Sequence, residues 1–280
     1  MVGQQVFSRK SVERKNCWQV ITHLPPTGQP LQRKLKRRSQ NSLRRKIENK
    51  PMMHFTYLGQ AGLLLETLNC TVMIDPYLSD SVGRMNPACH RRIPVDEHFL
   101  TVKPNVLVFT HDHLDHYDPE TVSHFLGNDT RITVLSPVSV WQKVRQIGGE
   151  NNYVLFNRGT EWTEFDLRFT AVFAAHSDPH AIGVLITDIE SGKNFYITGD
   201  SLYNRAVIAD LPEEIHTVFL PVNGVGNNMN MRDAARFVEH IAAKNVVPLH
   251  IGMFDSLSAV DFPCVNKVIP TIYSEIPLGD

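Results

Sequence analysis

After residue 53 the chain consists of short runs of apolar or alternating apolar and polar residues, and most of these runs predict β-strands. Apolar residues either alternate with polar ones or form brief continuous stretches, and Gly, Pro, Asn and Asp punctuate the boundaries. The turn Gly59-Gln60-Ala61-Gly62 joins the first two runs and predicts a hairpin. The expected strands are residues 54–58, 62–67, 71–74, 106–110, 132–135, 153–156, 161–163, 167–173, 183–187, 195–198, 218–221 and 246–249.

Three stretches instead show helical periodicity with start or stop signals. Residues 79–104 contain three prolines and are expected to form a loop. Strands dominate the first half of the chain, and strand–helix alternation enters later, so we expect sheets packed face to face with helices outside. The expected helices are residues 119–126, capped by Asp118, residues 138–147, ended by Gly148-Gly149, and residues 231–243, capped by Asn230.

The formal net charge of −1 conceals two different parts of the chain. Residues 1–50 hold 13 Lys or Arg against two acids, a net charge of +11, which leaves −12 for residues 51–280. We expect residues 1–52 to be a basic extension, disordered or translated ahead of the natural start, and residues 53–280 to be the folded domain. A tether to nucleic acid or another anionic surface, or a transit peptide, is the alternative interpretation of the extension.

Cysteine usage and hydropathy restrict the class of protein. No run of about eighteen apolar residues predicts a membrane span, and the first part of the chain lacks the apolar core of a signal peptide. The cysteines lie far apart without a Cys-x-x-Cys pair, which argues against a thiolate zinc site and a dense disulfide framework. A reducing, cytoplasmic location fits this pattern. The four cysteines are Cys17, Cys70, Cys89 and Cys264.

The candidate chemistry is concentrated in residues 106–118, which read V-L-V-F-T-H-D-H-L-D-H-Y-D. Three histidines and three aspartates directly follow an apolar strand, and imidazole with carboxylate suits zinc, manganese or iron. His111 and His113, two residues apart, can reach one metal ion. Asp115 and His116 can turn toward a second ion, and two ions about 3.5–4 Å apart form a clamp that activates water. A solvated polar loop explains one such residue, but not the whole cluster.

Three more candidate ligands stand at the ends of later strands. His176, Asp200 and His250 each follow an apolar run, and Gly199 lets the backbone turn closely before Asp200. Open α/β architectures collect ligands at the carboxyl ends of their strands. A lone histidine in such a place is more often a satisfied polar residue than a ligand. Three such residues together with the cluster at 111–116 favour a metal site.

Four segments resemble, in chain order, the metal-binding motifs of the metallo-β-lactamase superfamily: T-H-D-H-L-D-H, A-A-H-S-D, I-T-G-D-S and V-P-L-H. Asp75 in I-D-P-Y resembles the structural aspartate at a strand end of that superfamily. The resemblance covers roughly residues 53–255. It implies an α/β fold, a four-layer αββα sandwich with the metal ions at one edge.

The resemblance also implies roles for these residues. His111, His113 and His176 would hold the first metal, and Asp200 would bridge to the second. A second metal would be held by Asp115, His116 and His250. Two divalent ions, Zn²⁺ or Mn²⁺, would then generate a metal-bound hydroxide for hydrolysis. Asp115 is the candidate catalytic residue that orients this nucleophile and shuttles its proton.

Two further resemblances suggest different substrates, and a third hypothesis involves no catalysis. The turn Tyr57–Gly62, the Gly199-Asp200-Ser201 turn and the Asp233-Ala234-Ala235 helix resemble the L-ascorbate-6-phosphate lactonase group, which implies a small lactone or ester, with or without a phosphoryl group, as the substrate. Residues 94–118 resemble N-acyl-phosphatidylethanolamine phospholipase D, which implies a phosphodiesterase, nuclease or phospholipase D-like hydrolase as the alternative. A non-catalytic, metal-binding regulatory protein is the third hypothesis.

Weaker expectations concern partners and single residues. A small-molecule substrate is expected, the resemblance allows a homo-oligomer, and nucleic acid is a partner only if the basic extension is native. Candidates for substrate contact, each with a plain loop role as its alternative, are His180, Ser201 and Asp255. The arginines that would reveal a phosphorylated substrate if they reached the pocket are Arg84, Arg91, Arg92 and Arg205.

Overall fold

Two six-stranded sheets organise the protein. The computed structural model describes residues 53–127 and 131–279, and the expected basic extension, residues 1–52, lies outside them. The division of the chain near residue 52 therefore stays a prediction. In the first sheet the strand order follows the chain, antiparallel from β1 to β3 and parallel from β3 to β6. Its strands are β1 (His54–Gly59), β2 (Gly62–Glu66), β3 (Thr71–Ile74), β4 (Val106–Val108), β5 (Thr133–Ser136) and β6 (Asn152–Leu155).

The second sheet has the order β12-β11-β10-β9-β8-β7. Strands β7 to β10 pair antiparallel, and the last three strands pair parallel. Both sheets therefore contain an antiparallel part and a parallel part. The strands are β7 (Glu161–Glu164), β8 (Leu167–Phe173), β9 (Ile182–Asp188), β10 (Asn194–Ile197), β11 (Thr217–Pro221) and β12 (Asn245–Leu249).

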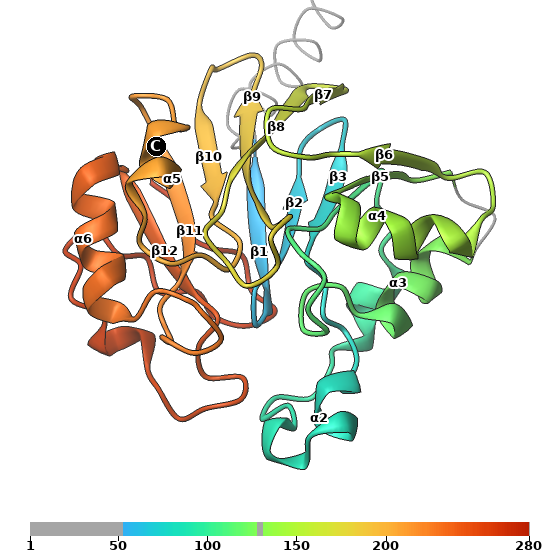
Figure 1. Ribbon diagram of the computed structural model, residues 1–280, viewed down its shortest axis with the longest axis horizontal. Helices are drawn as coiled ribbons and strands as arrows, with labels where there is room; N and C mark the ends of the chain where they lie inside the picture. The colour runs from blue at the N-terminus through green and yellow to red at the C-terminus, as the bar shows by residue number, and fades with distance from the viewer. Residues whose placement is uncertain (1–52, 128–130, 280) are drawn as a thin grey trace, which may run out of the picture. The chain divides into compact units, whose positions relative to one another are not determined.

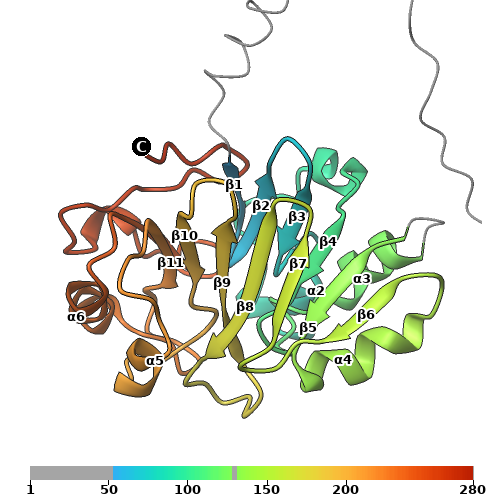
Figure 2. The same ribbon diagram turned by 90° about the horizontal axis from the view of Figure 1, so that it is seen from above.

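Helices cover the outer face of each sheet. Figures 1 and 2 show α3 and α4 beside the first sheet, and α5 and α6 beside the second. None of the helices within residues 53–127 and 131–279 is long and apolar enough to cross a membrane. The α-helices are α2 (Ser81–Met85), α3 (Pro119–Leu126), α4 (Val138–Val144), α5 (Arg205–Ala209) and α6 (Met231–Ile241). Single 3-10 turns are η1 (Pro87–Cys89), η2 (Glu97–Thr101), η3 (Arg145–Ile147) and η4 (Ala259–Asp261).

Strand β4 and the residue after it show how the sequence produces these layers. Val106 and Val108 join the apolar cluster between the two sheets, whereas Leu107 and Phe109 pack with the helices on the outer face. Side chains on a strand point alternately to opposite faces, so a continuous apolar run is buried on both sides. A third cluster packs α5 and α6 against the second sheet. These layers form the αββα sandwich, which confirms the expected fold class.

The observed elements match most of the predicted ones, with three corrections. The stretch 79–104 is not loop throughout, because it contains α2. Helix α5 was not predicted, and its five residues are too few to show a periodic pattern. The predicted helix 138–147 ends as an α-helix at Val144 and continues as the 3-10 turn η3. The predicted caps Asp118 and Asn230 are confirmed, since both side chains accept backbone N–H bonds of their helices.

Candidate metal centre

The segments that carry the predicted ligands converge from both sheets. The 111–116 loop leaves β4, His176 follows β8, Asp200 follows β10 and His250 follows β12. Gly199, with a φ of +58°, allows this approach: a Cβ there would lie 2.9 Å from Thr110 Cβ and 2.9 Å from the Ile182 carbonyl oxygen. Any larger residue would force the Asp200 turn away from the 111–116 loop.

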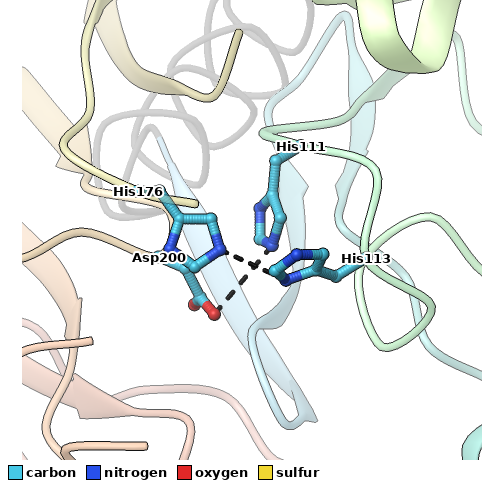
Figure 3. Close-up of side chains that lie close together, drawn as sticks. All are labelled: His111, His113, His176 and Asp200. Carbon is cyan, nitrogen blue, oxygen red and sulfur yellow. Dashed lines mark hydrogen bonds and ion pairs between the residues drawn. The ribbon is translucent and has the colours of Figure 1, made fainter. Parts of the chain in front are cut away.

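Four of the predicted ligands form what we call the first group: His111, His113, His176 and Asp200. Their candidate ligand atoms all lie within 4.8 Å of one another. His176 Nε2 lies 3.2 Å from His113 Nδ1, and His111 Nε2 lies 3.9 Å from Asp200 Oδ2. Figure 3 shows the four side chains pointing toward a common centre. His113 and His176 are partly exposed, whereas His111 and Asp200 are buried.

The other three predicted ligands form the second group: Asp115, His116 and His250. His250 Nε2 lies 3.1 Å from Asp115 Oδ2 and 3.4 Å from Asp200 Oδ2. His116 Nε2 lies 3.3 Å from Asp200 Oδ1. The two oxygens of Asp200 therefore face members of both groups. The structure brings all seven residues of the predicted set together in one cluster.

The buried nitrogens of this cluster fit a cation. His111 Nε2 and His116 Nε2 are buried, and neither has a hydrogen-bond partner among the described residues. Thr110 Oγ1 donates to Asp75 Oδ2 at 2.5 Å and lies 3.0 Å from His111 Nδ1, so it accepts a hydrogen bond from the N–H of that nitrogen. This tautomer leaves the Nε2 lone pair of His111 directed inward. A buried lone pair without a donor is costly, and a metal ion removes that cost.

Asp75 contacts the residues of the cluster on the side away from the candidate metal centre. Its Oδ1 accepts from the Thr110 backbone N–H at 2.8 Å, and its Oδ2 lies 2.8 Å from His116 Nδ1. Although Asp75 lies near His111 and His116, its two oxygens are already engaged. A carboxylate in this place fixes the orientation of the imidazole whose other nitrogen faces the centre. Asp75 directly follows β3 and has a left-handed backbone conformation, with a φ of +43°.

The surroundings shift the pKa values of the buried histidines in opposite directions. Burial, followed by the neighbouring His116, holds the pKa of His111 well below its usual range. Burial also acts on His116 and His250, but the carboxylates of Asp200 and Asp115 outweigh it and raise the pKa of both. Burial would raise the pKa of Asp200, yet His250 and His116 hold it well below its usual range. The cluster thus keeps its carboxylates ionised, and a bound cation would replace protons on the second group.

Sequence reasoning missed three amide side chains around the cluster. Gln60 Nε2 donates to Asp115 Oδ2 at 2.8 Å, and Asn228 Nδ2 donates to Asp200 Oδ2 at 3.0 Å. Asn223 Nδ2 lies 3.0 Å from His250 Nδ1. Gln60 stands in the turn Gly59–Gly62, which carried a resemblance but no assigned role. The two asparagines stand in a glycine-rich loop that gives no periodic signal.

The weaker single-residue candidates separate into loop and cavity positions. Ser201 Oγ accepts from the Ala175 backbone N–H at 3.0 Å, so it positions the segment just before His176. Asp255 Oδ1 accepts from the backbone N–H groups of Gly252 and Leu257, which makes it a loop-stabilising residue. His180 is exposed and lines a cavity that begins at His113.

This cavity lies beside the first group and measures about 590 Å³. Helix α4 supplies Ser139 and Lys143 to its wall. Among the described residues that line it, Lys143 is the only Lys or Arg, and its Nζ lies 2.7 Å from Asp112 Oδ2. None of the four arginines that the sequence suggested for the pocket lines this cavity. Arg84 pairs with Glu120, Arg91 donates to the Tyr77 carbonyl and Tyr273, and Arg92 donates to the Asp255 carbonyl.

Comparison with known proteins gives one family match. A family model described as beta-lactamase superfamily domain matches residues 71–251, which include all seven candidate ligands. The chain is 27% identical over 216 residues to a UPF0173 metal-dependent hydrolase of Staphylococcus aureus strain MRSA252, covering 72% of this chain and 87% of the relative.

Two solved structures share the fold. The isothiocyanate hydrolase from Delia radicum gut bacteria aligns with a TM-score of 0.62 at 20% identity, over 80% of this chain and 98% of that one. The metallo-beta-lactamase fold protein YhfI from Bacillus subtilis aligns with a TM-score of 0.60 at 15% identity, over 80% and 98% of the two chains. At these identities the likeness concerns the arrangement of sheets and helices.

Proposed function

Because the chain belongs to the beta-lactamase superfamily, we propose that it is a hydrolase whose seven-residue cluster holds two divalent metal ions. The observation that carries this proposal is that the buried Nε2 atoms of His111 and His116 make no hydrogen bond within the described residues. Both face the oxygens of Asp200, and an ion on each side of Asp200 would satisfy them. The similarity to the Staphylococcus aureus UPF0173 metal-dependent hydrolase supports the same class of activity.

The proposed mechanism assigns each side chain a task. When bound, Zn²⁺ or Mn²⁺ lowers the pKa of a water molecule enough to supply hydroxide near neutral pH. His111, His113 and His176 would hold the ion nearer the cavity, and Asp200, whose oxygens face both groups, would contribute its carboxylate to both ions. Asp115, whose side chain is 18% exposed, is the carboxylate of the second group that water can reach. It orients the nucleophile and carries its proton to the leaving group.

We propose a small lactone or carboxyl ester as the substrate. The cavity beside His113 has room for a small molecule, and its one lining cation, Lys143, is already paired with Asp112. A phosphoryl group carries about two negative charges and is held by unpaired Arg or Lys. The described wall of the cavity therefore favours an uncharged substrate over a phosphorylated one. The resemblance to the L-ascorbate-6-phosphate lactonase group supports a lactone or ester, with or without a phosphoryl group.

The test is a substrate panel on metal-loaded protein. Lactones, carboxyl esters and bis-p-nitrophenyl phosphate are each assayed with Zn²⁺ and with Mn²⁺. We expect turnover of lactones or esters that is lost in His113→Ala and retained in His240→Ala, a matched change of an exposed histidine on α6. Turnover confined to the phosphodiester would favour the phosphodiesterase alternative. Two bound metal ions without turnover of any substrate would favour a regulatory metal-binding protein.

A further inference from the structure

The turn between β1 and β2 places one buried amide beside the second group. Gln60 is 2% exposed and has a φ of +53°, a left-handed conformation that few residues other than glycine adopt. Gly59 before it has a φ of +94°, and a Cβ there would lie 2.5 Å from Met253 Cε. The turn is therefore tightly packed against the segment that follows His250.

The backbone of Gln60 is bonded directly to the His250 segment. The Gln60 carbonyl oxygen accepts from the His250 backbone N–H at 2.7 Å and from the Tyr57 hydroxyl at 2.9 Å. His250 itself is left-handed, with a φ of +59°. Two residues in a sparsely populated conformation persist only when their surroundings hold them there. Here the bond between Gln60 and His250 joins the two sheets at the candidate metal centre.

The side chain of Gln60 extends this connection to the ligand atoms. Its Nε2 donates to Asp115 Oδ2 at 2.8 Å and lies 3.0 Å from His250 Nε2 and 3.2 Å from His250 Nδ1. Within the described residues, these hydrogen bonds reach members of the second group and none of the first. An amide donor on one carboxylate oxygen leaves the other oxygen in a fixed direction.

We propose that Gln60 is a positioning residue that sets the affinity of the second group for a divalent cation and leaves the first group unaffected. This inference rests on the proposed two-metal function and adds that the Gln60 contacts act on only one of its two ions. Gln60 holds Asp115 and His250 in the arrangement that an ion requires, so less conformational freedom is lost on binding. Partners of this kind typically change metal affinity by about 10–100-fold.

The test measures Zn²⁺ bound per full-length chain as a function of buffered free Zn²⁺. Gln60→Asn keeps an amide and tolerates the left-handed backbone, but its shorter side chain withdraws the donor from Asp115. Gln60→Met keeps the volume and removes the donor. Gln146→Asn, at an exposed glutamine on η3 that bonds the Gln142 carbonyl, is the matched control. We expect both Gln60 variants to bind one equivalent about 10–100-fold more weakly and the other equivalent as the wild type does.

The outcomes separate this inference from the function on which it rests. A wild-type protein that binds two equivalents, with Gln60 variants that bind both within about twofold of it, would overturn the role of Gln60 alone. A parallel weakening of both equivalents would also overturn it, because the effect would then lie in the fold as a whole. A wild-type protein that binds no Zn²⁺ would instead overturn the proposed two-metal function.

Discussion

The first and second groups of the candidate metal centre differ in exposure and in ligand type. The first group has three histidines and one aspartate that also faces the second group; two of the histidines are partly exposed, and one of these, His113, lines the cavity. The second group is more enclosed, and two amides, Gln60 and Asn223, contact its members. The difference indicates a division of tasks: the first group faces the substrate, and the second is positioned by the protein around it.

Replacing Asp200 should have the largest effect, because its two oxygens face the ligand nitrogens of both groups. We expect Asp200→Asn to lose affinity for both ions and to lower turnover by at least about 10³-fold, comparable to removal of a principal electrostatic element of an active site. Elemental analysis after dialysis measures the first effect, and steady-state kinetics the second. An unchanged circular dichroism spectrum controls for folding. Retention of both ions by a folded variant would mean that Asp200 bridges nothing.

Substitution of a single candidate ligand in one group should remove one metal ion and leave the other bound. We expect His113→Ala to lose one equivalent of metal and His250→Ala the other, each with an affinity loss greater than about 100-fold, beyond that of a supporting partner. Adding Gln60→Asn should weaken the remaining equivalent in the His113→Ala protein but change little in the His250→Ala protein. Such a double-mutant cycle measures whether two residues share one site. Equal effects in both backgrounds would contradict the assignment of Gln60 to the second group alone.

Asp75 tests how strongly a carboxylate behind the cluster favours one group. Asp75→Asn keeps a side chain that tolerates the φ of +43°, but it removes the negative charge that faces His116 Nδ1. We expect the second group to bind its ion about 10–100-fold more weakly. The first group should change less, because Thr110 still contacts His111 Nδ1. Metal titration checks both numbers, and a larger loss at the first group would reverse the expected order.

The sequence predicted the residues that converge on the cluster better than the residues that position them. His176, Asp200 and His250 were recognisable because each ends an apolar strand, and strand ends of one fold meet at an edge. The strand pattern predicted sheets packed face to face with helices outside, because alternate residues face opposite layers, and the resemblance to the metallo-β-lactamase superfamily implied the αββα sandwich. Gln60 could not be assigned in this way: its role depends on a left-handed turn and on a partner 190 residues away.

Two other features were beyond sequence reasoning for a different reason. Helices α2 and α5 have five residues each, fewer than the two turns that would show a periodic apolar face. The cavity wall joins α4 to the 177–180 loop, a contact across the two sheets that no local pattern encodes. Lys143 was therefore not among the basic residues considered for the pocket, whereas the four arginines that were considered do not line it.

Substitution of Lys143 should have the smallest effect of these changes. It tests whether the substrate that binds beside the first group is phosphorylated. Its ion pair with Asp112 is exposed, so Lys143→Met should change the free energy of unfolding by only about 0–1 kcal/mol. If the substrate is an uncharged lactone or ester, kcat/KM should stay within about threefold of the wild-type value, as in the matched surface variant Lys193→Met. A phosphorylated substrate would instead lose a charge-assisted hydrogen bond of about 1.5–3 kcal/mol, or roughly 10–100-fold in kcat/KM. Kinetics on a lactone and on its phosphorylated analogue distinguish the two, since a loss confined to the analogue means that Lys143 exchanges Asp112 for the phosphate.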